Sequence, residues 1–167
     1  GRGVSFLEDK EGWHGKALDA EKCEEALKEI REANMPEIQI TAPENTARRI
    51  IDCVKVAQIT EYGKNEATRK AYGTALANLV RNNDNIVVLD AEVSNSTYSD
   101  EAKKVRPDRF IESYVAEQNM AGIALGLSVK GFNVFASTFA AFFSRAHDQI
   151  RMASLSSADV TFVGSHA

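Results

Sequence analysis

The chain has 167 residues, of which 44% are hydrophobic and 26% charged, and its formal net charge is −4. This mildly acidic balance argues against a nucleic-acid partner, which needs clustered Lys and Arg. No apolar run approaches the roughly 18 residues of a membrane-spanning helix, so we expect no membrane segment.

The length suits one ordinary domain or pieces of two. Cys23 and Cys53 have neither metal-ligand nor redox spacing, so we expect two free thiols and a cytoplasmic location. The chain begins GRGVSFLEDK without a methionine and stops at VGSHA, directly after a predicted strand. We therefore expect a segment of a longer protein, in which the lack of a targeting signal means little.

The first 65 residues predict a strand, a helix and a linker. Residues 2–7 have the composition of a short strand, and the polar loop after them contains His14. Apolar residues at helical spacing, with acidic residues in the first turn, predict an amphipathic helix over 19–34. Two prolines and the lack of a sustained period predict an interdomain linker over 35–65, with a short helix around 46–56.

The remaining residues alternate between helical and strand patterns with short connections. Helices are expected at 65–83, 95–105, 118–131 and 140–155, and strands at 85–93, 110–117, 133–139 and 159–165. This alternation predicts an α/β fold with a parallel sheet flanked by helices. The strands are continuous apolar runs, which is typical of strands covered on both faces.

Polar and ionisable residues follow these strands, at the edge where open parallel sheets bind their ligands. They are Asp90, Glu92 and the Asn95–Ser96–Thr97 helix cap, then Glu117, then the run from Ser137 to Phe142, and then His166. Each has an ordinary alternative: Ser96 as a helix cap only, Glu117 at a helix N-terminus, Phe139 and Phe142 in the core, and His166 in a loop. Their shared edge favours a site.

Glu117 and two phenylalanines, Phe139 and Phe142, suggest what this site binds. A carboxylate among aromatic rings is costly, because burial penalises charge. Such a cost is usual where a ligand binds. We interpret the group as a pocket for a flat heteroaromatic ring, with Glu117 hydrogen-bonded to a ring nitrogen.

Over essentially its whole length the chain resembles transketolase, a family of thiamine-diphosphate enzymes. The matching motifs are DKEGWHGK, ATRKAYG, the NST after LDAEV, PDRFIESYVAEQNM, STFAAFFSRAHDQIRMA and GSH, in that order. The resemblance implies part of a thiamine-diphosphate-binding fold. Residues 1–34 would end the diphosphate-binding domain, 35–65 would be the interdomain linker, and 66–167 would be the N-terminal part of the pyrimidine-binding domain.

The resemblance also implies roles for residues of the cofactor site. Glu117 would hydrogen-bond N1′ of the aminopyrimidine and share a proton with it, while Phe139 and Phe142 would stack on that ring. His14 would lie near the cofactor and the reacting carbonyl, where it could bind substrate and assist proton transfer. Lys16, in the same loop, is a weaker candidate.

Three further residues match positions that bind the sugar-phosphate end of the substrate: Arg69, Ser96 and His166. A guanidinium, a hydroxyl and an imidazole can all donate hydrogen bonds to phosphate oxygens. Glu92 departs from the family pattern, because an aspartate is expected there in a carboxylate network near the cofactor and the dimer contact. The longer side chain leaves its role open.

The family's diphosphate-and-metal motif, Gly-Asp-Gly followed by Asn, should precede residue 1. Ligands of Mg²⁺ are therefore expected outside this segment, and no metal ligand is assigned within it. In the family the site forms between two subunits of a homodimer, so His14 and Glu117 of one chain would serve different sites.

The resemblance thus implies transfer of a two-carbon ketol unit from a ketose phosphate to an aldose phosphate, in the pentose phosphate pathway. The segment by itself is expected to be inactive. A deoxyxylulose-phosphate synthase-like enzyme and a non-catalytic interaction fragment stay open as alternatives. The flanking sequence, with or without the diphosphate motif, would discriminate between them.

Overall fold

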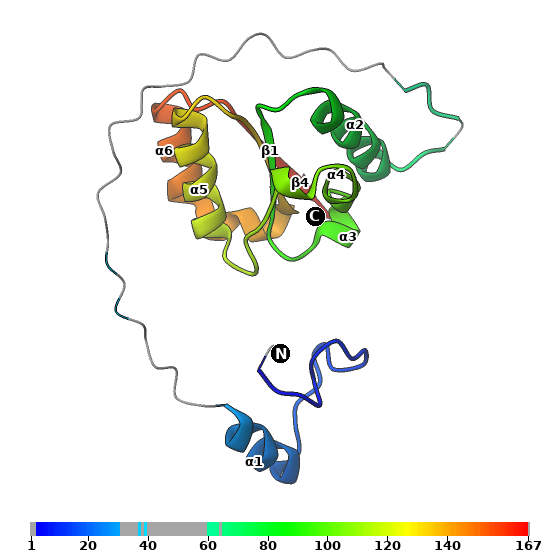
Figure 1. Cartoon of the computed structure of the whole chain (residues 1–167), viewed down its shortest axis with the longest axis vertical. Coiled ribbons are helices and arrows are strands. Elements are labelled where there is room, and N and C mark those ends of the chain that lie inside the picture. The colour runs from blue at the N-terminus through cyan, green and yellow to red at the C-terminus, as the bar shows by residue number, and fades with distance from the viewer. Residues whose placement is uncertain (1–2, 31–36, 38, 40–59, 64, 167) are drawn as a thin grey trace. The chain divides into compact units, whose positions relative to one another are not determined.

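The computed structural model describes residues 3–30, 37, 39, 60–63 and 65–166, and Figure 1 traces the chain. Contacts between residues divide the chain into two units, residues 1–44 and 45–167. The short helix predicted around 46–56 lies outside the described residues, as does most of the predicted linker. The assignment of the three predicted domains therefore stays a prediction. No helix in the described ranges is long and apolar enough to cross a membrane.

The first unit contains the helix α1 (Ala20–Glu29). Asp19 precedes it as the N-cap, and its carboxylate accepts a hydrogen bond from the backbone N–H of Lys22 at 2.9 Å. This bond satisfies a donor that the first helical turn leaves unpaired. The helix agrees with the prediction over 19–34 as far as residue 29, and residues 31–34 lie outside the described ranges.

The strand predicted over residues 2–7 is wrong for its described part, which forms turns. The backbone N–H of Leu7 donates to the carbonyl of Val4 at 2.9 Å. The carboxylate of Glu29 accepts hydrogen bonds from the backbone N–H and the hydroxyl of Ser5, at 2.6 and 2.8 Å. Because these backbone groups are satisfied locally, the apolar run requires no neighbouring strand.

The second unit is built on a four-stranded parallel sheet with the strand order β2–β1–β3–β4. The strands are β1 (Ile86–Asp90), β2 (Phe110–Glu112), β3 (Asn133–Phe139) and β4 (Val160–Ser165). The helices are α2 (Thr68–Asn82), α3 (Ser94–Thr97), α4 (Asp100–Val105), α5 (Glu117–Val129) and α6 (His147–Leu155), with 3-10 turns η1 (Pro107–Arg109) and η2 (Ala140–Ala146). The predicted α/β class, a parallel sheet flanked by helices, is confirmed.

Helices cover both faces of the sheet, with α5 and α6 on one side and α2, α3 and α4 on the other (Figure 1). Leu89 of β1 belongs to a buried cluster with Met120 of α5. Its neighbour Val88 belongs to a second cluster with Leu76 of α2. Successive side chains of a strand point to opposite faces, so the continuous apolar run of β1 is buried on both.

Several predicted elements differ from the structure. The strand predicted over 85–93 ends at Asp90. The helix predicted over 95–105 is interrupted where Tyr98 takes a left-handed conformation, with φ at 63°. The strand predicted over 110–117 stops early, and Glu117 begins α5 instead of ending a strand. The helix predicted over 140–155 begins as the 3-10 turn η2 before α6 follows. The strand at 133–139 has the predicted bounds.

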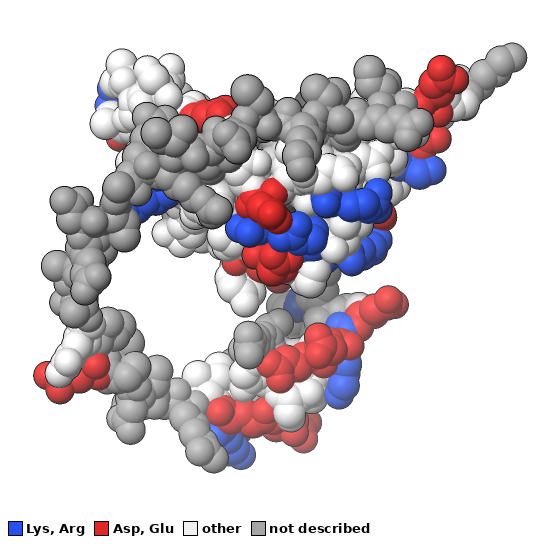
Figure 2. Space-filling model, turned by 45° about the horizontal axis from the view of Figure 1, so that its top comes forward, with Lys and Arg blue, Asp and Glu red and all other residues white. Residues whose placement is uncertain are grey.

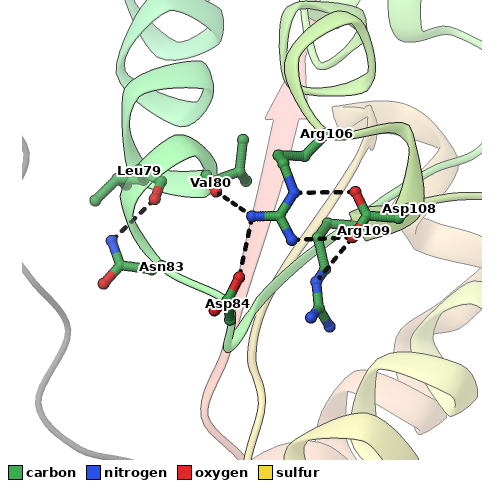
Figure 3. A network of polar contacts seen from close by, with 7 residues as sticks. All are labelled: Leu79, Val80, Asn83, Asp84, Arg106, Asp108 and Arg109. Carbon is green, nitrogen blue, oxygen red and sulfur yellow. Dashed lines mark hydrogen bonds and ion pairs between the residues drawn. The ribbon is translucent and has the colours of Figure 1, made fainter.

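A network of polar contacts holds the end of α2 to the segment after α4 (Figure 3). Arg106 donates hydrogen bonds to Asp84 at 3.1 Å and, through two nitrogens, to Asp108 at 3.0 and 2.9 Å. The hydrogen bond from Arg106 lowers the pKa of Asp108. The network lies beside the start of β1, so it fastens the sheet at the end opposite to the strand ends where the candidate residues gather.

On the face seen in Figure 2, Lys and Arg side chains lie among Asp and Glu side chains. Several of the second unit's cations are paired with neighbouring carboxylates, as Lys104 is with Asp100 and Glu101 at 2.9 and 2.7 Å. Exposed pairs of this kind contribute little to stability. They do, however, distribute the two signs of charge over the surface.

Candidate active site

Arg69, in the first turn of α2, meets the chain where β4 ends. Its Nη1 lies 3.1 Å from Nε2 of His166 and donates a hydrogen bond of 3.1 Å to the carbonyl of Ser96. A guanidinium has only donors, so Nε2 of His166 accepts. Nδ1 of the same imidazole lies 3.0 Å from the hydroxyl of Ser165. The three residues predicted to bind a sugar phosphate thus lie together.

Arg69 and His166 line a cavity of about 470 Å³ at the carboxyl edge of the sheet. Its lining comes from the start of α2, from α3 and from the end of β4. The lining residues are Ala67, Thr68, Arg69, Tyr72, Thr97, Val163, Gly164, Ser165 and His166. The cavity has the position that ligand sites take in open parallel sheets.

Buried polar groups fix the α3 segment below this cavity. The carboxylate of Asp90 accepts hydrogen bonds from the hydroxyls of Thr97 and Ser99 at 2.7 and 2.8 Å, and from the backbone N–H of Val93 at 2.7 Å. The expectation that Asn95 or Ser96 caps a helix here is therefore wrong, because Asp90 supplies the acceptor from the preceding strand.

Burial raises the pKa of Asp90, and the hydrogen bonds from Thr97, Val93 and Ser99 oppose that rise. A second buried pair lies nearby, where the hydroxyl of Tyr72 is 2.7 Å from Oγ of Ser137. Burial also raises the pKa of Tyr72, so its phenol is neutral at physiological pH. These groups position the backbone of the site, and the hydrogen bonds satisfy them inside the fold.

Glu117 begins α5 with only 3% of its surface exposed. Its Oε1 accepts a hydrogen bond of 2.7 Å from Nη1 of Arg145, an arginine of η2 whose side chain is half exposed. A carboxylate at the first helical position also interacts favourably with the helix dipole. Both residues line a second cavity, of about 570 Å³, together with Val115, Ala116, Gln118 and Asn119.

An aromatic row connects the two cavities. The ring centroids of Phe139 and Phe142 are 5.2 Å apart, and those of Phe139 and His166 are 4.8 Å apart. The guanidinium carbon of Arg145 lies over the Phe142 ring, 4.5 Å from its centroid. Phe139 ends β3 beside Ser165 of β4 in the sheet register, which is why His166 reaches it. Contacts therefore run without interruption from Glu117 to Arg69.

Arg145 is the member of this row that sequence reasoning missed. It stands in an otherwise polar stretch, SRAHDQ, which is typical of an exposed helical face. The one signal in the sequence is its position three residues after Phe142 and within a helical pattern, since residues spaced by three lie on the same side of a helical turn. Nothing in the local sequence connects it with Glu117, 28 positions away.

His14 and Lys16 belong to the first unit, and only their surroundings within that unit are given. His14 is exposed, and Nζ of Lys16 lies 4.9 Å from the centroid of the Trp13 ring. Their predicted roles stay predictions. Glu92, in the second unit, is exposed with φ at 61°, and its backbone N–H donates to Oε1 of Glu112 at 2.9 Å. Among the residues that the structure describes, no cluster of three His, Cys, Asp or Glu could hold a metal ion.

The fold and the site define a parallel α/β domain with a cavity at the carboxyl edge of its sheet. The family model "Transketolase, pyrimidine binding domain" matches residues 64–167. Transketolase of Homo sapiens is 46% identical over 172 residues, which cover 99% of this chain and 28% of that protein. The chain belongs to the transketolase family.

Solved structures agree with this assignment. A structure described as "Split gene transketolase, inactive beta4 tetramer" shares 46% identity at a TM-score of 0.55, covering 61% of this chain and 34% of its own. Transketolase from Leishmania mexicana shares 26% identity at a TM-score of 0.60, covering 65% of this chain and 18% of its own. The chain thus spans well under half the length of these relatives.

Proposed function

We propose that the chain is part of a transketolase, which transfers a two-carbon ketol unit from a ketose phosphate to an aldose phosphate in the pentose phosphate pathway of the cytoplasm. The observation that carries the proposal is the continuous row of contacts from Glu117 to Arg69. This row puts groups suited to a heteroaromatic ring beside groups suited to a phosphate.

The Glu117 end of the row fits the aminopyrimidine of thiamine diphosphate. Phe139 and Phe142 offer aromatic surface for stacking. The carboxylate of Glu117, which accepts a hydrogen bond from Arg145 in this structure, can bond a ring nitrogen and hold a proton there. Bound thiamine diphosphate would supply the electron sink for breaking the carbon–carbon bond. Mg²⁺ and its ligands would belong to another part of the protein.

The Arg69 end of the row fits the phosphate of the sugar. Nη1 of Arg69 is engaged by Ser96 and His166. Its Nε and Nη2 have no hydrogen-bond partner among the described residues, and they can therefore bind phosphate oxygens in the bidentate manner of a guanidinium. The hydroxyl of Ser96 and the imidazole of His166 would complete the site.

We further propose a homodimer whose active sites lie between subunits, with residues 1–34 ending a diphosphate-binding domain and 66–167 beginning the pyrimidine-binding domain. His14 of one chain would then serve the site opposite to that of its own Glu117. The similar split-gene transketolase is described as an "inactive beta4 tetramer". That description supports the view that this portion of a transketolase needs its complementary portion for activity.

A direct assay of the full-length protein that contains this chain tests the proposal. Purified protein, thiamine diphosphate and Mg²⁺ are incubated with a ketose phosphate donor and an aldose phosphate acceptor, and the products are followed by mass spectrometry. We expect the acceptor to gain two carbons and the donor to lose two. A parallel incubation replaces the ketose phosphate with pyruvate, which can supply an acetyl-level two-carbon unit with release of carbon dioxide, and formation of deoxyxylulose phosphate there would favour the synthase alternative. Binding of a partner without turnover of any sugar phosphate would favour the interaction fragment.

A further inference from the structure

One guanidinium holds both groups that the proposed ring site requires. Nη1 of Arg145 donates to Oε1 of Glu117 at 2.7 Å, and its Cζ lies 4.5 Å from the centroid of the Phe142 ring. A ring that stacks on the same face of Phe142 and hydrogen-bonds Oε1 of Glu117 would have to displace this guanidinium. Arg145 and the ring therefore compete for the same two partners.

The other rings of the row already contact one another. Phe139 already lies between Phe142 and His166, with centroid distances of 5.2 and 4.8 Å. The two ends of the row are therefore the guanidinium of Arg145 and the imidazole of His166. The carboxylate of Glu117 is at the Arg145 end, so a ring that uses this carboxylate must enter there.

The two partners of this ion pair differ sharply in exposure. Glu117 has 3% of its side-chain surface exposed and Arg145 has 50%. A buried carboxylate that loses its counter-ion is strongly destabilising, so Glu117 needs a partner in the folded protein. Arg145, by contrast, already contacts water and adjoins a cavity of about 570 Å³. Its side chain can leave the pair with little further change in solvation.

We propose that Arg145 is a displaceable counter-ion, which neutralises Glu117 and covers Phe142 until the aminopyrimidine ring takes its place. The inference rests on the proposed function, because it presumes that a ring binds here. Arg145 is then a positioning residue that lowers cofactor affinity while stabilising the protein before cofactor binds. A residue that merely supported the site would have the opposite effect on affinity.

Arg145→Met in the full-length protein separates these possibilities. We expect thiamine diphosphate, measured by calorimetry at saturating Mg²⁺, to bind about 10-fold more tightly to this variant, because the ring no longer displaces a charged hydrogen bond. Arg151→Met is the matched control. Arg151 follows on α6 and pairs with the exposed Asp148 at 2.8 Å, so its removal should leave the affinity unchanged.

Thermal melting gives an independent readout. Without cofactor, Arg145→Met should melt below the wild type, because Glu117 has lost its buried partner. With saturating cofactor the difference should shrink, since tighter binding stabilises the variant more. Arg145→Lys keeps a charge near Glu117 but has no planar group to cover Phe142. It should therefore bind the cofactor more tightly than the wild type but less tightly than Arg145→Met, and it serves as the test if the Met variant does not fold.

The outcomes are distinct. Equal or weaker cofactor binding by Arg145→Met, with Arg151→Met unchanged, overturns the counter-ion inference and leaves the proposed function intact. Equal or weaker binding by Arg145→Lys does the same if only that variant folds. A wild-type protein that does not bind thiamine diphosphate at all overturns both the inference and the proposed function.

Discussion

Nη1 of Arg69 lies 3.1 Å from Nε2 of His166, although 97 positions separate the two residues in the chain. The contact joins a residue early in the second unit's sequence to a residue near its C-terminal end. Arg69 comes from the first turn of α2, and His166 directly follows β4. A phosphate bound here would be held by groups that only the completed sheet brings together.

Arg69→Ala in the full-length protein should raise KM for phosphorylated sugars and leave kcat nearly unchanged. The proposed phosphate contact is remote from the reacting carbon, so it stabilises ground and transition states alike. Losing a charged hydrogen bond costs roughly 1.5–3 kcal/mol, or about 10- to 100-fold in KM. Steady-state kinetics measure both constants, and Lys70→Ala, which removes an exposed ion pair with Glu66, is the control.

Ser96→Ala extends the same test. Arg69 bonds the backbone carbonyl of Ser96, not its hydroxyl, so this variant keeps the guanidinium in place. A smaller rise in KM than for Arg69→Ala is therefore expected. A collapse of kcat at unchanged KM in either variant would put these residues at the chemistry instead of at the phosphate.

Gly73→Ala should destabilise the second unit by about 1–3 kcal/mol, the usual effect of overpacking a buried site. A Cβ at Gly73 would lie 2.6 Å from Cβ of Tyr98 and closer still to its carbonyl oxygen, so α2 and the α3 segment would have to separate. Gly126→Ala is the matched control in α5, where a Cβ meets nothing within 4 Å and should be neutral or stabilising. Urea unfolding measures the stability of both variants. Equal stability of Gly73→Ala and Gly126→Ala would contradict this expectation.

Much of the second unit's fold follows from its sequence. The strand at 133–139 is bounded by a glycine-containing turn and by the two alanines that begin η2, so its limits can be predicted from the sequence. The early end of β2 is not readable. Ser113 still donates its backbone N–H to the carbonyl of Asp90 at 2.9 Å, and the chain then turns at Tyr114, where φ is 55°. The residues after Glu112 therefore form a loop. The contact with β1 that ends the strand cannot be predicted from the local sequence.

The site residues that lie at or near the carboxyl ends of strands could be predicted from the sequence. Motifs and strand ends point to Arg69, Ser96 and His166, and these residues lie in contact. They do not point to Arg145, because its partner Glu117 reaches it through packing between α5 and η2. No spacing in the sequence encodes that packing.

Asp90→Asn should change how stability depends on pH. Burial raises the folded-state pKa of Asp90, so the folded protein holds this proton more tightly than the unfolded chain does. The contribution to stability is full below the unfolded pKa of about 3.9 and is lost as pH rises through the higher folded pKa. Asn has no such proton. The unfolding free energy of the wild type, minus that of Asp90→Asn, should therefore fall as pH rises above about 4. Urea unfolding measures both free energies at each pH. If their difference were the same at every pH, Asp90 would not be the source of this pH dependence.

The 167-residue chain alone should bind thiamine diphosphate with Mg²⁺ no more tightly than about millimolar, roughly −4 kcal/mol. The diphosphate and metal ligands are expected in another part of the protein. Calorimetry with the purified chain measures this directly, after circular dichroism has established that it is folded. Micromolar binding would mean that these residues suffice for the whole cofactor site.

The central claim is that Glu117 shares a proton with the cofactor ring, and Glu117→Gln tests it. The amide is close in shape and can still accept the hydrogen bond from Arg145, so packing should be preserved. It cannot share the proton, and kcat should fall by at least about 10²-fold, the lower range for a positioned proton-transfer group. A carboxylate that serves only the helix N-terminus would instead lose about 0.3–1 kcal/mol of stability with near-normal turnover.

Deuterium exchange at C2 of bound thiamine diphosphate, followed by NMR, is the most direct measurement. It is compared between the wild-type full-length protein, Glu117→Gln and the control Glu101→Gln, which alters an exposed carboxylate paired with Lys104. We predict that exchange slows greatly in Glu117→Gln and is unchanged in Glu101→Gln. Equal exchange rates in Glu117→Gln and the wild type would contradict the proposed role of Glu117.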